Sequence, residues 1–170
     1  MKTLYLLRHA KSSWDNPALS DRDRPLNARG DRDAPRIGAA IGKRLLPMVF
    51  HVSPAERAQQ TFHALCTTWR GLEALHGITI PALYTFDYRQ VLNWITECGI
   101  TDDALALVGH NPALTELVCY LVSPNALDNL PTAGWVEVGL PIDRWQDIQS
   151  AQYGGELLYW LFPKMLGIEI

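Results

Sequence analysis

The chain has 170 residues, of which 48% are apolar and 19% charged, and its 15 basic and 18 acidic side chains give a formal net charge of −3. This length suits one domain whose core needs no disulfides or metals, so we expect a single domain over residues 1–170. The apolar share is too high and the net charge too small for a disordered protein. The acidic balance supplies no global positive field, which argues against a dedicated nucleic-acid binder.

The N-terminal segment and the cysteines indicate the cellular compartment in which the protein resides. Residues 1–8 hold too few apolar side chains for the core of a signal peptide, and no run of 18 apolar residues predicts a membrane span. Cys66, Cys98 and Cys119 are widely spaced and form no Cys-x-x-Cys pair, so we interpret them as small core hydrophobes. We therefore expect a cytoplasmic protein without membrane attachment. The ordinary apolar content predicts a monomer.

Strand-like and helix-like segments alternate along the chain. The expected elements, in order, are a strand at 4–7, a polar loop at 12–25, a helix from 27 to about 46, a strand at 49–52, a helix from about 55 to 69, a strand at 78–84, a helix at 91–98, a strand at 104–108, a helix to 121, and strands at 135–140 and 157–162. This alternation predicts parallel β-α units. We expect an α/β three-layer sandwich with a mostly parallel central sheet flanked by helices, the last two strands being an antiparallel addition.

Local signals support several of these boundaries. Asn27 and Ser53 precede the first two helices and are candidate N-caps, and Gly99 follows the third helix in the position of a C-terminal stop. Pro81 lies inside the expected strand at 78–84 and weakens it, because proline cannot donate a backbone hydrogen bond to a neighbouring strand.

The chemistry-bearing residues follow the expected parallel strands directly. Arg8 and His9 follow the first strand, Arg57 lies shortly after the second, and His110 follows the apolar strand at 104–108. Because ligands of open α/β sheets bind outside the carboxyl ends of the strands, these side chains should converge on one edge of the sheet. Two guanidinium groups and two imidazoles form a cationic site suited to a phosphoryl dianion.

Other phosphate and metal chemistry fits the chain less well. It contains neither a Gly-x-x-x-x-Gly-Lys-Ser/Thr loop nor a Gly-x-Gly-x-x-Gly turn, so a glycine-rich nucleotide cradle is not expected. The arginines beside the histidines would repel a metal ion, and no carboxylates accompany them at ligand spacing. We therefore expect no metal and no cofactor. Taken singly, each residue has a structural interpretation as a core histidine, a solvated arginine or a helix cap; the ordered set favours function.

These segments carry a resemblance. Residues 6–11, which contain Arg8 and His9, resemble the Arg-His-Gly signature of the histidine phosphatase superfamily, with Ala10 in place of the glycine. Residues 53–61 and 109–112 are similar to the second and third motifs of that family. The polar segment 19–30 and the short length resemble its SixA-type phosphohistidine phosphatase branch. The resemblance continues in order to 131–133 and 162–164, and it implies a phosphoglycerate mutase-like fold.

The resemblance also implies roles for individual residues. His9 would be the nucleophile, taking the phosphoryl group to form a phosphohistidine that water then hydrolyses. Arg8 and Arg57 would hold the equatorial phosphoryl oxygens, and His110 would be a protonated donor to the same oxygens. Trp14 is close enough in sequence to line the mouth of the site.

A general acid and additional phosphate ligands are harder to assign. Many members of the family use a carboxylate that follows the third strand, where this chain offers Asp87; Asp21 and Asp23 in the polar loop are the alternatives. An alkoxide leaving group needs a well-placed acid, whereas the labile phosphorus–nitrogen bond of phosphohistidine tolerates a weak or absent one. Ser12 and the amide of Asn111 are candidates for a further hydrogen bond to phosphate.

Three functions remain open at this point. The first is a metal-independent phosphatase acting through phospho-His9 on phosphohistidine in a protein. The second is a phosphomonoesterase with the same mechanism acting on a small phosphorylated molecule. The third is a non-catalytic module that binds phosphate, although binding alone would need no nucleophile. The expected partner is accordingly a phosphorylated protein or a small phosphorylated substrate.

Overall fold

A six-stranded sheet forms the centre of the protein, as given by a computed structural model that describes residues 1–167. The strands are β1 (Lys2–Arg8), β2 (Phe50–Val52), β3 (Ile78–Thr79), β4 (Ala104–Gly109), β5 (Trp135–Leu140) and β6 (Glu156–Leu161). Their order is β3-β2-β4-β1-β5-β6. The first four strands run parallel, and β5 and β6 are added in antiparallel pairs, as predicted.

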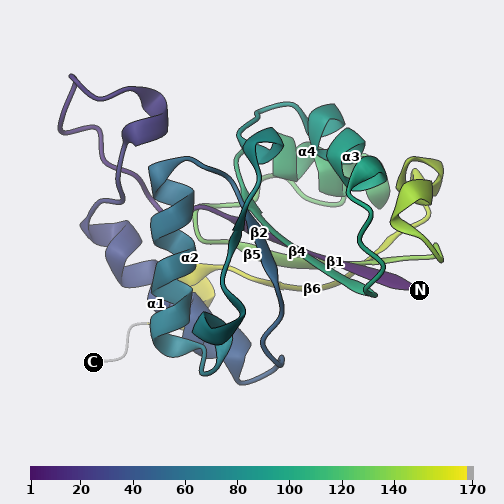
Figure 1. Cartoon of the computed structure of the whole chain (residues 1–170), viewed down its shortest axis with the longest axis horizontal. Helices are drawn as coiled ribbons and strands as arrows, with labels where there is room; N and C mark the ends of the chain where they lie inside the picture. Colours follow the sequence, from purple (N-terminus) through teal and green to yellow (C-terminus); the bar gives the residue numbers. More distant parts are fainter. Residues whose placement is uncertain (168–170) are drawn as a thin grey trace.

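Helices cover both faces of this sheet (Figure 1). They are α1 (Ala28–Gly42), α2 (Glu56–Thr68), α3 (Tyr88–Glu97) and α4 (Ala113–Leu121). One core cluster joins the sheet to α1 and α2, and a second joins the opposite face to α3 and α4. The expected three-layer α/β sandwich is confirmed. Among residues 1–167, no helix is both long and apolar enough to span a bilayer.

Strand β1 is central because its side chains are apolar on both faces. Leu4 and Leu6 belong to the α3/α4 core and Leu7 to the α1/α2 core, all fully buried. Parallel pairing aligns Arg8 with Gly109 of β4, and the His9 amide donates to the Gly109 carbonyl at 3.1 Å. His9 and His110, which directly follow β1 and β4, therefore lie at the same edge of the sheet.

Several expected boundaries differ from the structure, among them the end of the first helix, which is Gly42 and not about residue 46. The predicted strand at 78–84 contains only the two residues of β3, and Pro81 instead opens a short 3-10 helix at Pro81–Leu83, because it lacks the N–H that a longer ladder needs. The second helix is capped by Ala55 and not by Ser53, whose hydroxyl accepts from the Ala55 amide at 3.2 Å just outside the helix.

Two further helix starts show how polar side chains set the boundaries. Asn27 caps α1 as predicted, and its side chain accepts from the Gly30 amide at 2.9 Å. The third helix begins earlier than the expected residue 91, at Tyr88, because the Asp87 side chain accepts from the Arg89 amide at 2.9 Å and caps it.

Candidate active site

His9 lies immediately beyond β1 with an exposed fraction of only 7%. Its Nδ1 is 2.7 Å from the carbonyl oxygen of Ala10. A carbonyl can only accept, so Nδ1 carries the ring proton and the lone pair is on Nε2. Burial lowers the pKa of His9 well below its usual value, and the charges of His110, Arg57 and Arg8 lower it further against the opposing Ala10 hydrogen bond. At neutral pH the ring is therefore uncharged, and Nε2 carries a lone pair.

His110 follows β4 and packs beside His9, with the ring centroids 5.2 Å apart. Its Nε2 lies 2.7 Å from the Ser53 hydroxyl. Burial, followed by the charge of Arg57, lowers the pKa of His110 to about 3. In the free protein His110 is therefore neutral, which differs from the protonated donor that we expected. A phosphoryl dianion placed beside the ring would raise this pKa again, since an opposite charge favours the protonated form.

Arg57 projects from the first turn of α2 and is 98% buried, its exposed fraction being 2%. Its Nε donates to Nε2 of His9 at 3.4 Å. The two terminal nitrogens donate to the backbone carbonyl of Asp21 at 2.6 Å and to the Asp21 carboxylate at 3.0 Å. The guanidinium group thus connects His9 to the polar loop that extends beyond α2 (Figure 1).

Asp21 is held by three donors, of which Arg57 is one. Its carboxylate also accepts from the Tyr84 hydroxyl at 2.5 Å and from Arg24 at 3.2 Å. Partial burial acts to raise the pKa of Asp21, but the hydrogen bonds from Tyr84 and Arg57 outweigh it and lower the pKa to about 2. At neutral pH Asp21 is ionised, so in the free protein it has no proton to donate.

Several buried nitrogen atoms at this cluster have no hydrogen-bond partner within the described residues. Among residues 1–167, Arg8 Nε, Arg24 Nε and His110 Nδ1 are buried without a hydrogen-bond partner. Arg8 is otherwise anchored by a bond from its terminal nitrogen to the Leu130 carbonyl at 3.1 Å. Buried donors are normally satisfied, and an oxyanion would accept from the Nε–H groups of the two arginines.

The two candidates for an additional phosphate contact are already bonded within the protein. Ser12 is buried and its hydroxyl accepts from Arg24 at 2.8 Å. The Asn111 amide donates to the carbonyl of Leu130 at 2.8 Å and to Asn129 at 3.2 Å. Both therefore serve to position neighbouring groups in the free protein.

The other two candidates for the general acid, Asp87 and Asp23, bond to residues other than the two imidazoles. Asp87 caps α3 and pairs with Arg89, its carboxylate 3.0 Å from the guanidinium group. Asp23 is exposed and accepts from the Ser20 hydroxyl at 3.0 Å. The structure thus brings Asp21 to Arg57, whereas Asp23 and Asp87 bond to residues of their own segments.

Residues that the sequence did not single out complete the site. Arg24 joins Ser12 to Asp21 and lies over the exposed Trp14 ring at 3.5 Å. Tyr84 bonds to Asp21 and packs edge-on against His110 with centroids 5.4 Å apart. The position of Arg24 within the polar loop is the one sequence signal that could have pointed to it. No local sequence pattern marks Tyr84. Among the described residues, no group of three or more His, Cys, Asp or Glu side chains is arranged to hold a metal ion.

Sequence comparison places this geometry in a known family. The model of the histidine phosphatase superfamily (branch 1) matches residues 4–83. A Mycobacterium tuberculosis protein of uncharacterized function is 31% identical over 159 residues, covering 84% of this chain and 92% of the relative. A chloroplastic Arabidopsis thaliana protein, also uncharacterized, is 29% identical over 128 residues. That match covers 71% of this chain but 59% of the plant protein, so the chain spans less than two thirds of that relative.

Solved structures agree in fold. A protein assigned as the phosphohistidine phosphatase SixA of Agrobacterium tumefaciens is 26% identical, with a TM-score of 0.76 and coverage of 95% of this chain and 98% of the other. The protein histidine phosphatase SixA in complex with tungstate has a TM-score of 0.75 at 21% identity, covering 97% and 99%. A mycobacterial glucosyl-3-phosphoglycerate phosphatase has a TM-score of 0.69 at 17% identity, covering 94% and 99%. The chain belongs to the histidine phosphatase superfamily, and it shares its fold with the SixA phosphohistidine phosphatases.

Proposed function

We propose that this protein is a metal-independent phosphatase that forms a phosphohistidine on His9 and acts on phosphohistidine displayed by another protein. The observation that carries the proposal is the His9 ring, whose unprotonated Nε2 lies among cationic groups. Nδ1 is committed to the Ala10 carbonyl and Arg57 approaches Nε2 at 3.4 Å. A neutral nucleophile held beside donors for a dianion is what in-line phosphoryl transfer needs.

The reaction proceeds in two displacements. In the first, Nε2 of His9 forms a bond to phosphorus as the bond from phosphorus to the leaving nitrogen breaks, and that nitrogen keeps the electron pair. Arg8, Arg57 and His110 stabilise the charge on the equatorial oxygens. In the second, water attacks phosphorus, the bond to Nε2 breaks, and the proton lost by water passes to the released phosphate or to solvent, leaving neutral His9.

Substrate choice follows from the absence of a free acid near the imidazoles among the described residues. In the free protein Asp21 is ionised and Asp87 is bound to Arg89, so neither holds a proton ready for a poor leaving group. A phosphohistidine whose second ring nitrogen is protonated leaves as neutral imidazole and needs no such donor. The SixA proteins of similar fold support the same choice.

A second candidate is a phosphatase for small phosphomonoesters, favoured by the likeness to a glucosyl-3-phosphoglycerate phosphatase. The two are separated by comparing kcat/KM on a phosphohistidine peptide with kcat/KM on a panel of sugar and nucleotide phosphates. We expect the peptide to be preferred at least tenfold. A clear preference for the monoesters would replace the first candidate by the second.

The catalytic role is tested by His9→Ala, with His63→Ala, an exposed histidine of α2, as the matched control. In buffer with chelator, the wild type and the control should turn over and yield an acid-labile phosphoenzyme on rapid quenching. His9→Ala should do neither. Turnover retained in His9→Ala, or wild-type turnover lost on chelation, would refute the mechanism, and binding of phosphate without turnover would indicate the non-catalytic module.

A further inference from the structure

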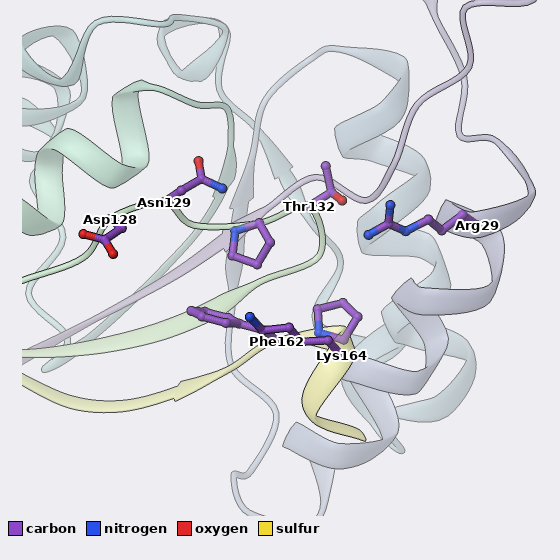
Figure 2. Close-up of a pocket in the computed structure, with 8 residues that line it drawn as sticks. Arg29, Asp128, Asn129, Thr132, Phe162 and Lys164 are labelled. Carbon is purple, nitrogen blue, oxygen red and sulfur yellow. The ribbon is translucent and has the colours of Figure 1, made fainter. Parts of the chain in front are cut away.

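A groove along α1 is lined by four basic side chains together with acidic, polar and apolar ones. A cavity of about 280 Å³ lies between α1, the loop at 128–132 and the segment that follows β6. A larger groove of about 770 Å³ continues from it along α1, sharing Arg29 and Lys164. Figure 2 shows Arg29 directed from α1 toward Thr132, with Phe162 and Lys164 along the other wall.

Both walls of this groove contact residues 8–11, the segment that contains His9. On one side, the Ala133 amide donates to the carbonyls of Arg8 and His9, each at 3.1 Å. On the other side, the first turn of α1 packs so closely on Lys11 that a Cβ at Gly30 would lie 2.3 Å from the Lys11 carbonyl oxygen. The groove is therefore linked through these backbone contacts to the segment that contains His9.

The charge of the groove is positive although the chain is acidic overall. Arg29, Arg32 and Arg36 follow one another along α1, at distances of 3.5, 3.3 and 3.9 Å from the carboxylate of Asp33. That carboxylate has an exposed fraction of only 3%, so three guanidinium groups share one buried acid and two positive charges stay uncompensated. Lys164 adds one positive charge from the opposite wall and Asp128 adds one negative charge, so the lining as a whole has a net charge of +2.

We propose that this groove binds an acidic segment of the phosphoprotein substrate, next to its phosphohistidine; the inference rests on the proposed function. The surface is concave and includes apolar side chains, Phe162 and Pro131 among them. This shape receives a protruding peptide or helix better than a flat bilayer. Carboxylates of the substrate would pair with the exposed guanidinium groups, and such pairing sets specificity and association rate more than raw affinity.

The test compares two synthetic peptides of equal length, each with one central phosphohistidine, flanked by glutamates in one and by glutamines in the other. We expect kcat/KM of the wild type to be about tenfold higher on the acidic peptide, mainly through KM, and the preference to shrink as salt is added. The groove variant Arg32→Glu/Lys164→Glu should lose the preference. Its activity on p-nitrophenyl phosphate should be unchanged, because neither residue belongs to the catalytic cluster.

The matched control is Lys43→Glu/Arg70→Glu, which makes the same change in net charge at exposed positions away from the groove. It should keep the preference. Equal hydrolysis of the two peptides by the wild type, or a preference that persists in the groove variant, overturns the groove assignment and leaves the proposed function standing. Failure to hydrolyse either peptide, with p-nitrophenyl phosphate still hydrolysed, overturns both. Equal peptide rates together with groove-dependent sedimentation on phosphatidylserine vesicles would assign the surface to anionic lipid instead.

Discussion

The Asp21 carboxylate occupies donors of Arg57 that a phosphoryl group would need. It accepts from one terminal nitrogen of Arg57 at 3.0 Å, while the Asp21 backbone carbonyl accepts from the other at 2.6 Å. A bound dianion would share this guanidinium group with an ionised carboxylate and be repelled by it. We therefore expect Asp21→Asn, which keeps the size and the backbone bond but removes the charge, to bind phosphate more tightly.

The magnitude follows from the pKa of Asp21. The difference between its ordinary value of 3.8 and about 2 corresponds to about 2.4 kcal/mol of net interaction with its surroundings. The side chain is 42% exposed, and part of the interaction is with Tyr84, so solvent screening leaves about 1 kcal/mol acting against the phosphate. A change of about 1 kcal/mol is about fivefold in an equilibrium constant.

The assay is competitive inhibition of p-nitrophenyl phosphate turnover by inorganic phosphate at pH 7.5. The inhibition constant should fall about fivefold in Asp21→Asn. Asp23→Asn is the control, since this carboxylate lies in the same loop but bonds to Ser20. If the inhibition constant instead rises in Asp21→Asn, Asp21 positions Arg57 and does not compete with phosphate. An equal fall of the inhibition constant in Asp23→Asn would show that the effect comes from the net charge of the loop and not from the contact between Asp21 and Arg57.

Two further predictions concern stability. The pKa values of His9 and His110 are lowered by folding, so the unfolded chain takes up protons first; stability is complete above pH 6.5 and decreases as the pH falls below it. Urea denaturation should show a free energy of unfolding about 2.7 kcal/mol lower at pH 5.5 than at pH 7.5, with about half of that difference lost in His110→Gln. A free energy of unfolding that does not change with pH would contradict this prediction. Gly30→Ala should destabilise by about 2 kcal/mol because its Cβ would overlap the Lys11 carbonyl, whereas Gly154→Ala, with no contact below 3.4 Å, should be nearly neutral.

The sheet and the placement of the cationic residues could be predicted from the sequence because both depend on short-range patterns. The apolar runs of β1 and β4 are buried on both faces, and each ends at a histidine-containing segment, so the rule that ligands bind at the carboxyl ends of strands was enough to bring His9 and His110 together. Their ring centroids lie 5.2 Å apart. Their catalytic roles stay predictions.

What could not be predicted depends on how a loop folds back over the site. The carboxylate of Asp21 reaches Arg57 across 36 residues and Tyr84 across 63, and no local periodicity encodes either contact. The neutral state of His110 arises from burial and from Arg57, both properties of the assembled core. Asp87 looked like an acid from its position after the third strand, but the earlier start of α3 uses its carboxylate as a helix cap.

The state of the acids narrows the chemistry of the site. An alkyl phosphate leaves as an alkoxide and gains most from a proton donor, yet Asp21 has a pKa of about 2 and is ionised at neutral pH. A phosphoryl dianion that competes for Arg57 would weaken the bonds that keep this pKa low, and the added negative charge would raise it. Asp21 would then hold a proton that it could donate only after substrate binding, whereas a phosphohistidine protonated on its second nitrogen needs no donor. The same substitution, Asp21→Asn, should therefore lower kcat on phosphomonoesters while leaving kcat on a phosphohistidine peptide nearly unchanged, and an equal loss on both would show that Asp21 acts through the position of Arg57.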